Sequence, residues 1–291
     1  ISMISYATMA IEAGQCEIAV VSLADNPATG TRQAYEKSYG DDGSALFGWF
    51  GTPAGYAMIA QRHMAQFGTT SDQLGAIAVA CSRHGAANPH AQLRKPLSLE
   101  QYSESRMIVA PLRRDDCCLV SDGAAAVVLM SATKAAALKV ARPVPVLGFG
   151  QGQTSWDVAL RPDLTTTAAA VSAQTAFAMA GLTPADIDVA QIYDCFTYAV
   201  IRQLEDMGFC AKGEGGPFVQ GGRLQLGGAL PTNTHGGLLS QAHIWGLNHI
   251  VELVRQLRGD GGRAQVTDAQ VGLVTGYGDL GDGALAIMRR G

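Results

Sequence analysis

The sequence predicts an α/β protein made of two halves that share one folding plan. Short apolar runs alternate with segments whose apolar residues recur at helical spacing, a pattern typical of strands covered by helices on both faces. Residues 121–130 and 281–288 follow one pattern, in which Asp-Gly leads into an apolar strand that closes its half. Such an internal repeat predicts a duplication, and we place the two halves at residues 1–142 and 143–291.

Glycine, proline and capping residues mark where the elements begin or end. Gly14 ends the first helix, Pro53 falls in the first turn of the second, and Asp194 is expected to cap the helix that follows it. Helices are expected at residues 2–13, 53–67, 71–81, 98–105, 133–140, 165–180, 196–208 and 247–258. Strands are expected at residues 17–22, 124–131, 146–149, 189–193, 271–275 and 283–288, and loops at 83–90, 150–161 and 212–228. Residues 24–118 would then form a large insertion in the first half.

Length and composition describe a compact globular protein. The 291 residues suffice for a substantial core, since 47% are hydrophobic and 16% charged. A net charge of −4 without a block of like charges argues against nucleic acid, which needs a basic face. No uncharged apolar run reaches bilayer length, so no membrane span is expected. Six cysteines without metal-ligand spacing indicate neither a metal site nor a disulfide framework, and we expect a cytoplasmic protein.

Polar residues gather at residues 231–246, immediately before an amphipathic helix. They include Asn233, His235 and His243, with the glycine pair Gly236 and Gly237 between the two histidines. Unbonded N–H groups and the positive end of the dipole at a helix start favour developing negative charge. We therefore predict an oxyanion site there. The competing interpretation makes His235 an ordinary turn histidine and lets Asn233 fix the turn through its side chain.

Several segments resemble the thiolase family. Residues 233–243 are similar to the thiolase segment in which Asn-x-x-Gly-Gly precedes a Gly-His-Pro histidine. Residues 193–196, Tyr-Asp-Cys-Phe, stand where thiolases have Asn-Glu-Ala-Phe or, in the sterol-carrier branch, His-Asp-Cys-Phe. Residues 276–283 stand where thiolases have a glycine loop led by Cys or His. In the first half, residues 83–92 and 111–126 are similar to sterol-carrier-type thiolases, so the resemblance covers essentially the whole chain in the family's order.

This resemblance implies the thiolase fold, with two duplicated α/β halves, each a five-stranded sheet, in a layered α/β/α/β/α arrangement, usually as a homodimer. The first helix would align with the one that in thiolases begins at the acylated cysteine. The chain also begins inside a helical pattern, without an initiator methionine or a signal peptide. We therefore expect a truncated N-terminal half, with the nucleophile position just before Ile1.

Two departures from the thiolase pattern change the expected chemistry. Tyr277 stands at the second Cys/His position, and Tyr193 at the Asn/His position that helps to hold an oxyanion. A phenol, with a pKa of about 10, forms no acyl-enzyme as a thiolate does, but it donates a proton or, tuned by a neighbouring charge, removes one. The substitutions look like those of the thiolase-related aldolases that shorten steroid side chains and work with a partner carrying an OB-type domain.

We predict a thiolase-fold enzyme of lipid or steroid catabolism that cleaves a β-hydroxyacyl-CoA by a retro-aldol reaction. Tyr277 and Tyr193 are the expected proton-transfer groups, and His243 is expected to hold the enolate. Substrate contacts are expected from Asn233, His235, Gly236, Gly237 and Gly278. No tightly bound cofactor is expected, because coenzyme A is part of the substrate. Two alternatives stay open: an acyltransferase whose nucleophilic cysteine precedes Ile1, and a non-catalytic subunit that binds acyl-CoA.

Overall fold

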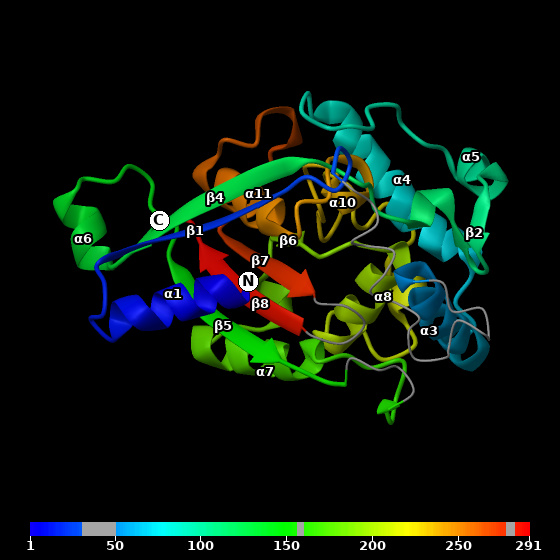
Figure 1. Ribbon diagram of the computed structural model, residues 1–291, viewed down its shortest axis with the longest axis horizontal. Helices are drawn as coiled ribbons and strands as arrows, with labels where there is room; N and C mark the ends of the chain where they lie inside the picture. The colour runs from blue at the N-terminus through cyan, green and yellow to red at the C-terminus, as the bar shows by residue number, and fades with distance from the viewer. Residues whose placement is uncertain (31–50, 156–159, 278–282) are drawn as a thin grey trace.

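The computed structural model describes residues 1–30, 51–155, 160–277 and 283–291, and the side chain of Tyr277 lies outside this description. Strands and helices alternate through these residues, as an α/β protein requires (Figure 1). Two strand pairs are β1 (Ile18–Asp25) with β4 (Gly123–Met130) and β2 (Met107–Val109) with β3 (Leu112–Arg113). A four-stranded sheet has the order β5 (Val146–Gly152), β8 (Gly283–Arg289), β7 (Val271–Tyr277) and β6 (Val189–Gln191).

Eight of the described helices lie close to predicted positions, whereas α9 and α10 were not predicted. The helices are α1 (Ser2–Glu12), α3 (Thr52–Phe67), α4 (Ser71–Ala87), α5 (Leu99–Glu104), α6 (Ala132–Ala137), α7 (Ala169–Ala180), α8 (Thr197–Asp206), α9 (Gly215–Phe218), α10 (Gly237–Ser240) and α11 (Leu247–Arg258). None of the helices in the described ranges has both the length and the apolar character needed to cross a bilayer.

Several predicted boundaries are wrong; strand β1 continues to Asp25, and α7 begins only at Ala169. Helix α4 runs through residues 82–87, where a loop was expected; Gly85 there lacks the Cβ that would lie 2.8 Å from the Cβ of Ser240, so α10 can pack against it. Strand β5 continues to Gly152, because its ladder with β8 extends into the predicted loop. Helix α9 interrupts the glycine-rich stretch 212–228, which was expected to be irregular.

Alternation along the strands sends the four-stranded sheet into two different cores. Leu273, Leu285 and Ile287 join the larger cluster, which includes α7, whereas Val274 and Ala286 join the cluster that includes α1 and α11. Helices α1 and α11 also contact β1 and β4, so they lie between the two sheets. Figure 1 shows the resulting order of layers: α7, the four-stranded sheet, α1 with α11, and the β1–β4 pair. The predicted thiolase-type α/β fold is confirmed.

The predicted five strands per half are seen only in part among the described residues. In the second sheet Thr232 makes a parallel bridge to Ala190 of β6, and the N–H of Ala190 donates to the carbonyl of Pro231. The first residues of the predicted site therefore occupy the fifth-strand position. In the first half the described strands of the layered fold are β1 and β4. The division at residues 142 and 143 stays a prediction.

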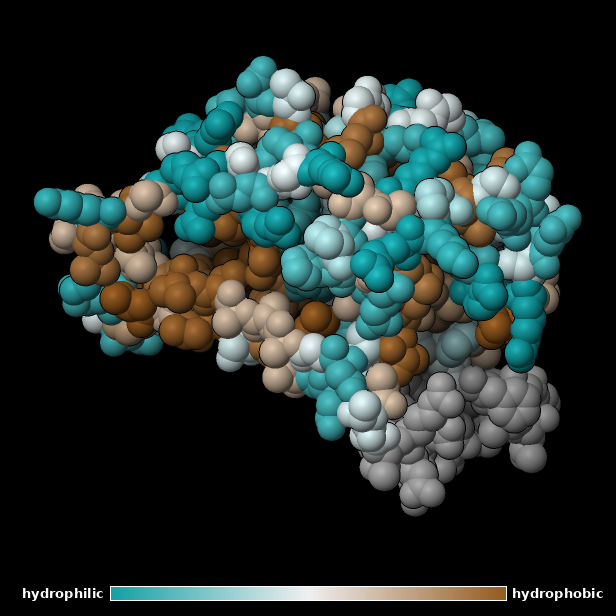
Figure 2. Space-filling view, turned by 90° about the horizontal axis from the view of Figure 1, so that it is seen from above, coloured by the Kyte–Doolittle hydropathy of each residue, from teal (hydrophilic) through white to brown (hydrophobic). Residues whose placement is uncertain are grey.

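One face of the β1–β4 pair is apolar and exposed. Val21 faces inward and is buried, whereas Val20 and its partner Val128 are 66% and 58% exposed. Ile18, two residues before Val20, is exposed on the same face. Figure 2 shows a broad hydrophobic area on the left of the molecule, the side on which β1 and β4 lie in Figure 1. Both faces of this pair thus have the apolar character of a strand pair covered on each side.

Glycines of β5 set the distance between the strand and α7. A Cβ at Gly150 would lie 2.0 Å from the carbonyl oxygen of Ser172, one at Gly148 2.4 Å from that of Ala176, and one at Gly152 2.5 Å from that of Ala168. We predict that Gly150→Ala lowers the free energy of unfolding by at least about 2 kcal/mol, because either α7 or the strand must move. Denaturant unfolding followed by circular dichroism measures the change. Gln151→Ala, an exposed position on the same strand, is the matched control and is expected to have little effect.

Candidate active site

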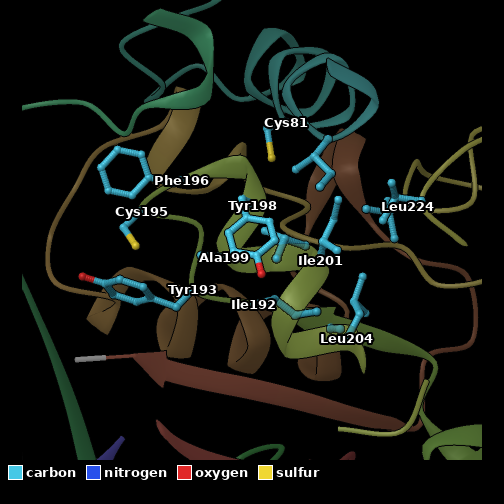
Figure 3. Packing of buried hydrophobic residues seen from close by; sticks show 14 of the residues in the cluster. Cys81, Ile192, Tyr193, Cys195, Phe196, Tyr198, Ala199, Ile201, Leu204 and Leu224 are labelled. Carbon is cyan, nitrogen blue, oxygen red and sulfur yellow. The ribbon is translucent and has the colours of Figure 1, made fainter. Parts of the chain in front are cut away.

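Tyr193 is a buried residue that is positioned by the strand that precedes it. It follows β6 by two residues, its N–H donates to Thr275 Oγ1 at 2.8 Å, and its carbonyl accepts from Gln203 Nε2 at 2.8 Å. Thr275 donates in turn to Gln203 Oε1 at 2.6 Å, which closes a buried triangle between β7, α8 and the end of β6. Figure 3 shows the Tyr193 ring at the margin of the hydrophobic cluster, with its hydroxyl pointing away from the other labelled residues. The backbone of Tyr193 is thus held by hydrogen bonds on both sides, and the residue is only 5% exposed, with its hydroxyl directed away from the cluster.

His243 meets this hydroxyl from a different loop. It lies in residues 241–246, between α10 and α11, and is half-buried. The Tyr193 hydroxyl is 3.1 Å from His243 Nε2, and the two rings are 6.2 Å apart in an edge-to-face arrangement. The N–H of His243 donates to Ser121 Oγ at 2.9 Å. The structure thus brings together two of the three predicted catalytic residues, and the contact can pass a proton between phenol and imidazole.

Beneath this pair lies Asp194, a fully buried carboxylate with its own set of donors. It accepts from the N–H of Leu238 at 2.8 Å and of Leu239 at 3.3 Å, and from Cys81 Sγ at 3.6 Å. His249 Nε2 is 3.1 Å from the same carboxylate and 3.2 Å from the carbonyl of Ile192; both are acceptors, so Nε2 carries the proton. Such donors offset the cost of burying a carboxylate.

The prediction that Asp194 caps the following helix is wrong. Helix α8 begins after Phe196 without a side-chain cap, and Asp194 instead binds the first turn of α10, more than forty positions along the chain. Gly237 makes this possible: its φ is +65°, and a Cβ there would lie 2.0 Å from Asp194 Oδ2. A glycine at 237 is therefore a packing requirement of the buried carboxylate.

The other predicted substrate-binding residues of this stretch are occupied within the protein. Asn233, at φ +55°, accepts from the N–H of Ile192 and donates to its carbonyl, both at 2.8 Å. Gly236 packs on α4, where a Cβ would lie 2.9 Å from Gly85 Cα. His235 is 2% exposed and lies edge-to-face against His249, with ring centroids 4.8 Å apart. These contacts match the competing interpretation, in which Asn233 and His235 serve the turn.

The amides predicted to form an oxyanion site are also used internally. At the start of α11 the N–H of Leu247 donates to the carbonyl of Ile244 at 3.0 Å, and that of His249 to Gly246 at 3.2 Å. At α10 the first amides bind Asp194. We therefore expect side chains to stabilise negative charge on a substrate. His243 is the candidate among the described residues, because it lies beside the Tyr193 hydroxyl. Tyr277 ends β7 opposite Gly283, but its side chain and all of Gly278 lie outside the described residues.

Comparison with known proteins places the chain in a family. Residues 150–288 match the thiolase C-terminal domain-like family. The chain is similar to 17-hydroxy-3-oxo-4-pregnene-20-carboxyl-CoA lyase of Mycobacterium tuberculosis, with 40% identity over 88% of this chain and 70% of the relative. It is also 40% identical to acetyl-CoA acetyltransferase of Methanothermobacter thermautotrophicus, over 79% of this chain and 61% of the relative. A chain of the Ltp2-ChsH2(DUF35) aldolase superposes with a TM-score of 0.90 at 36% identity, covering 99% of this chain and 76% of that chain.

The layered fold and these similarities together define one class, and the chain belongs to the thiolase superfamily. Within the superfamily, the predicted resemblance to steroid side-chain aldolases is confirmed, because a steroid CoA lyase and an aldolase are similar over most of both chains.

Burial around the site makes two histidines sensitive to acid. Burial, followed by the neighbouring His249 and His84, holds the pKa of His235 well below its usual value of about 6.5. Burial likewise lowers the pKa of His84, whose Nε2 accepts from the N–H of Leu226 at 3.2 Å and must be unprotonated to do so. The unfolded chain therefore binds more protons than the native state below pH 6.5.

We predict that the free energy of unfolding falls as the pH is lowered from about 7 to 5. A His235→Asn variant is expected to show a shallower fall over the same interval, because its neutral side chain binds no proton in either state. His90→Asn, at an exposed position, is the matched control and should keep the wild-type slope. Urea unfolding at several pH values measures this; equal slopes for wild type and His235→Asn would contradict the prediction.

Proposed function

We propose that this chain cleaves the Cα–Cβ bond of a β-hydroxyacyl-CoA by a retro-aldol reaction. The observation that carries the proposal is the partly buried 3.1 Å contact between the Tyr193 hydroxyl and His243 Nε2. The similarity to a lyase whose named substrate is a 17-hydroxy steroid carrying a 20-carboxyl-CoA supports it, because that compound has its hydroxyl β to the thioester carbonyl. We therefore propose a steroid or similarly bulky lipid as the acyl part.

The phenol and imidazole divide the proton transfers between them. Tyr193 takes the proton of the β-hydroxyl as its own proton passes to His243 Nε2, the Cα–Cβ bond breaks, and its electron pair forms the thioester enolate. The imidazolium then donates a hydrogen bond to the enolate oxygen. Tyr277, assigned by its place in the sequence, returns a proton to Cα. The products are a ketone and a shortened acyl-CoA. Tyr193 ends neutral with the proton it took from the substrate, and proton exchange with solvent restores Tyr277 and His243 to their starting forms.

The described thiols give little support to acyl transfer by this part of the chain. Burial raises the pKa of Cys81 and Cys118 well above the usual value of a thiol, and that of Cys117 and Cys210 to about 12. Nucleophilic catalysis needs the thiolate, which these pKa values disfavour. The acetyltransferase similarity makes acyl transfer the competing outcome of an assay rather than a second proposal.

We extend the proposal to assembly and location. Coenzyme A enters as part of the substrate, and we propose a partner of the DUF35 type, because the similar aldolase carries that partner in its name. The exposed face of β1 and β4 supports association through the first sheet, and we propose a homodimer as the core of the assembly. All six cysteines lie in described parts of the chain and none forms a disulfide, which supports a cytoplasmic enzyme.

We predict that Tyr193→Phe lowers kcat for ketone release from a β-hydroxyacyl-CoA about 100-fold, the usual size of a lost proton transfer. KM is expected to stay within about threefold, since the phenol acts mainly in the transition state. His243→Ala should show a similar loss. Tyr6→Phe, at an exposed tyrosine far from Tyr193 and His243 in the sequence, is the matched control. Wild-type kcat in both variants, or thiolysis of a 3-ketoacyl-CoA by free coenzyme A with no retro-aldol activity, would overturn the proposal.

Tyr277→Phe tests the second proton transfer. Loss of the Cα proton donor should lower kcat about 100-fold. The shortened acyl-CoA formed in deuterated water should carry one deuterium at Cα in the wild type, and mass spectrometry measures it. Full activity of Tyr277→Phe would remove this tyrosine from the mechanism without affecting the assignment of Tyr193.

A further inference from the structure

The loop that carries His243 is tied to the end of a strand in the other sheet. Asp25 is the last residue of β1, and its Oδ2 accepts from Trp245 Nε1 at 2.7 Å. Its other carboxylate oxygen accepts from the N–H of Asn26 at 2.8 Å, which fixes the orientation of the acceptor. The Trp245 ring in turn lies 5.3 Å from the ring of His243. Trp245, which packs beside the His243 imidazole, is therefore linked by a hydrogen bond to β1 of the first sheet.

Trp245 holds a conformation that its own side chain does not favour. Its φ is +48°, in the left-handed region that bulky residues rarely adopt, and it is followed by Gly246 at φ +79°. The indole is 42% exposed, so burial contributes only part of what is needed to keep it there. A strained residue persists where its surroundings determine its geometry, and such residues concentrate at functional sites. The bond to Asp25 is a specific contact that fixes the indole.

The same end of the β1–β4 pair holds the loop at two further points. Ser121, two residues before β4, accepts from the N–H of His243 at 2.9 Å and is 1% exposed. Gly123, which pairs with Asp25, has no Cβ, and one placed there would lie 2.7 Å from Ile244 Cδ1. Three successive residues of the loop, 243 to 245, are therefore set by this strand end. Ser121 holds the backbone N–H of His243 and Gly123 leaves room for the Ile244 side chain, whereas Asp25 binds the indole that lies beside the imidazole.

We propose that Asp25 is a positioning residue for the reaction: through Trp245 it holds the His243 ring in line with the Tyr193 hydroxyl. The inference rests on the proposed role of His243. Catalytic groups lose much of their effect when displaced by about 1 Å, so a contact one residue removed from the chemistry can set the rate.

The test compares four variants by their kcat and KM for retro-aldol cleavage. Asp25→Ala and Trp245→Phe each remove one side of the hydrogen bond and are expected to lower kcat about tenfold, with KM within about twofold of wild type. Asp25→Asn keeps an acceptor oxygen and should retain most of the wild-type kcat. Asp122→Ala is the matched control, because this neighbouring carboxylate accepts from the N–H groups of Ala28 and Thr29 instead of from the loop. It should keep kcat within about twofold.

A second background separates positioning from a general structural effect. In a His243→Ala enzyme, Asp25→Ala should cause no further loss, because the residue it positions is gone. Multiplied losses in that background, or a wild-type kcat for both Asp25→Ala and Trp245→Phe, would overturn the inference. A wild-type kcat for His243→Ala alone would instead overturn the proposed function. Should Asp25→Ala not fold, Trp245→Phe, which keeps a ring in place, decides the question by the same criteria.

Discussion

A carboxylate without contact with water organises the second half of the molecule. Asp194 joins four segments that are distant in sequence: the end of β6, the first turn of α10, His249 of α11 and Cys81 of α4. Removing a carboxylate from water is costly, and that cost is offset only when every one of these donors is in place. The chain on either side of Asp194 is thereby fixed. Tyr193 occupies the adjacent position, so the reactive phenol is placed by the same contacts that satisfy a buried charge.

Local patterns in the sequence predict much of the fold. Apolar alternation at residues 271–275 and 283–288 predicts two strands, and the structure pairs them as β7 and β8. Gly14 correctly marks the end of the first helix, because an L residue resists the left-handed turn that closes a helix. Prediction fails where tertiary packing decides: α4 continues through Gly85, which packs against Ser240, far away in the sequence.

For the candidate site as well, the sequence predicts which residues take part but not which residues they bind. The family resemblance singled out Tyr193 and His243, and the structure places them 3.1 Å apart although fifty positions separate them. The resemblance did not reveal what Asp194 binds. An aspartate just before a helix normally caps it, and only the three-dimensional approach of Gly237 shows that another helix is served. Ser121, which holds the backbone of His243, left no signal in the sequence beyond a serine beside an Asp-Gly turn.

The interface between the two sheets has a consequence for how such an enzyme can change over time. Tyr193 follows a strand of the four-stranded sheet, whereas the loop that carries His243 is held by residues at the end of β1 and β4. Neither sheet can drift relative to the other without separating imidazole from phenol, so substitutions that repack α1 and α11 are selected for chemistry as well as for stability. Variation in substrate should therefore accumulate in the loops around the rim, while the helices between the sheets diverge slowly.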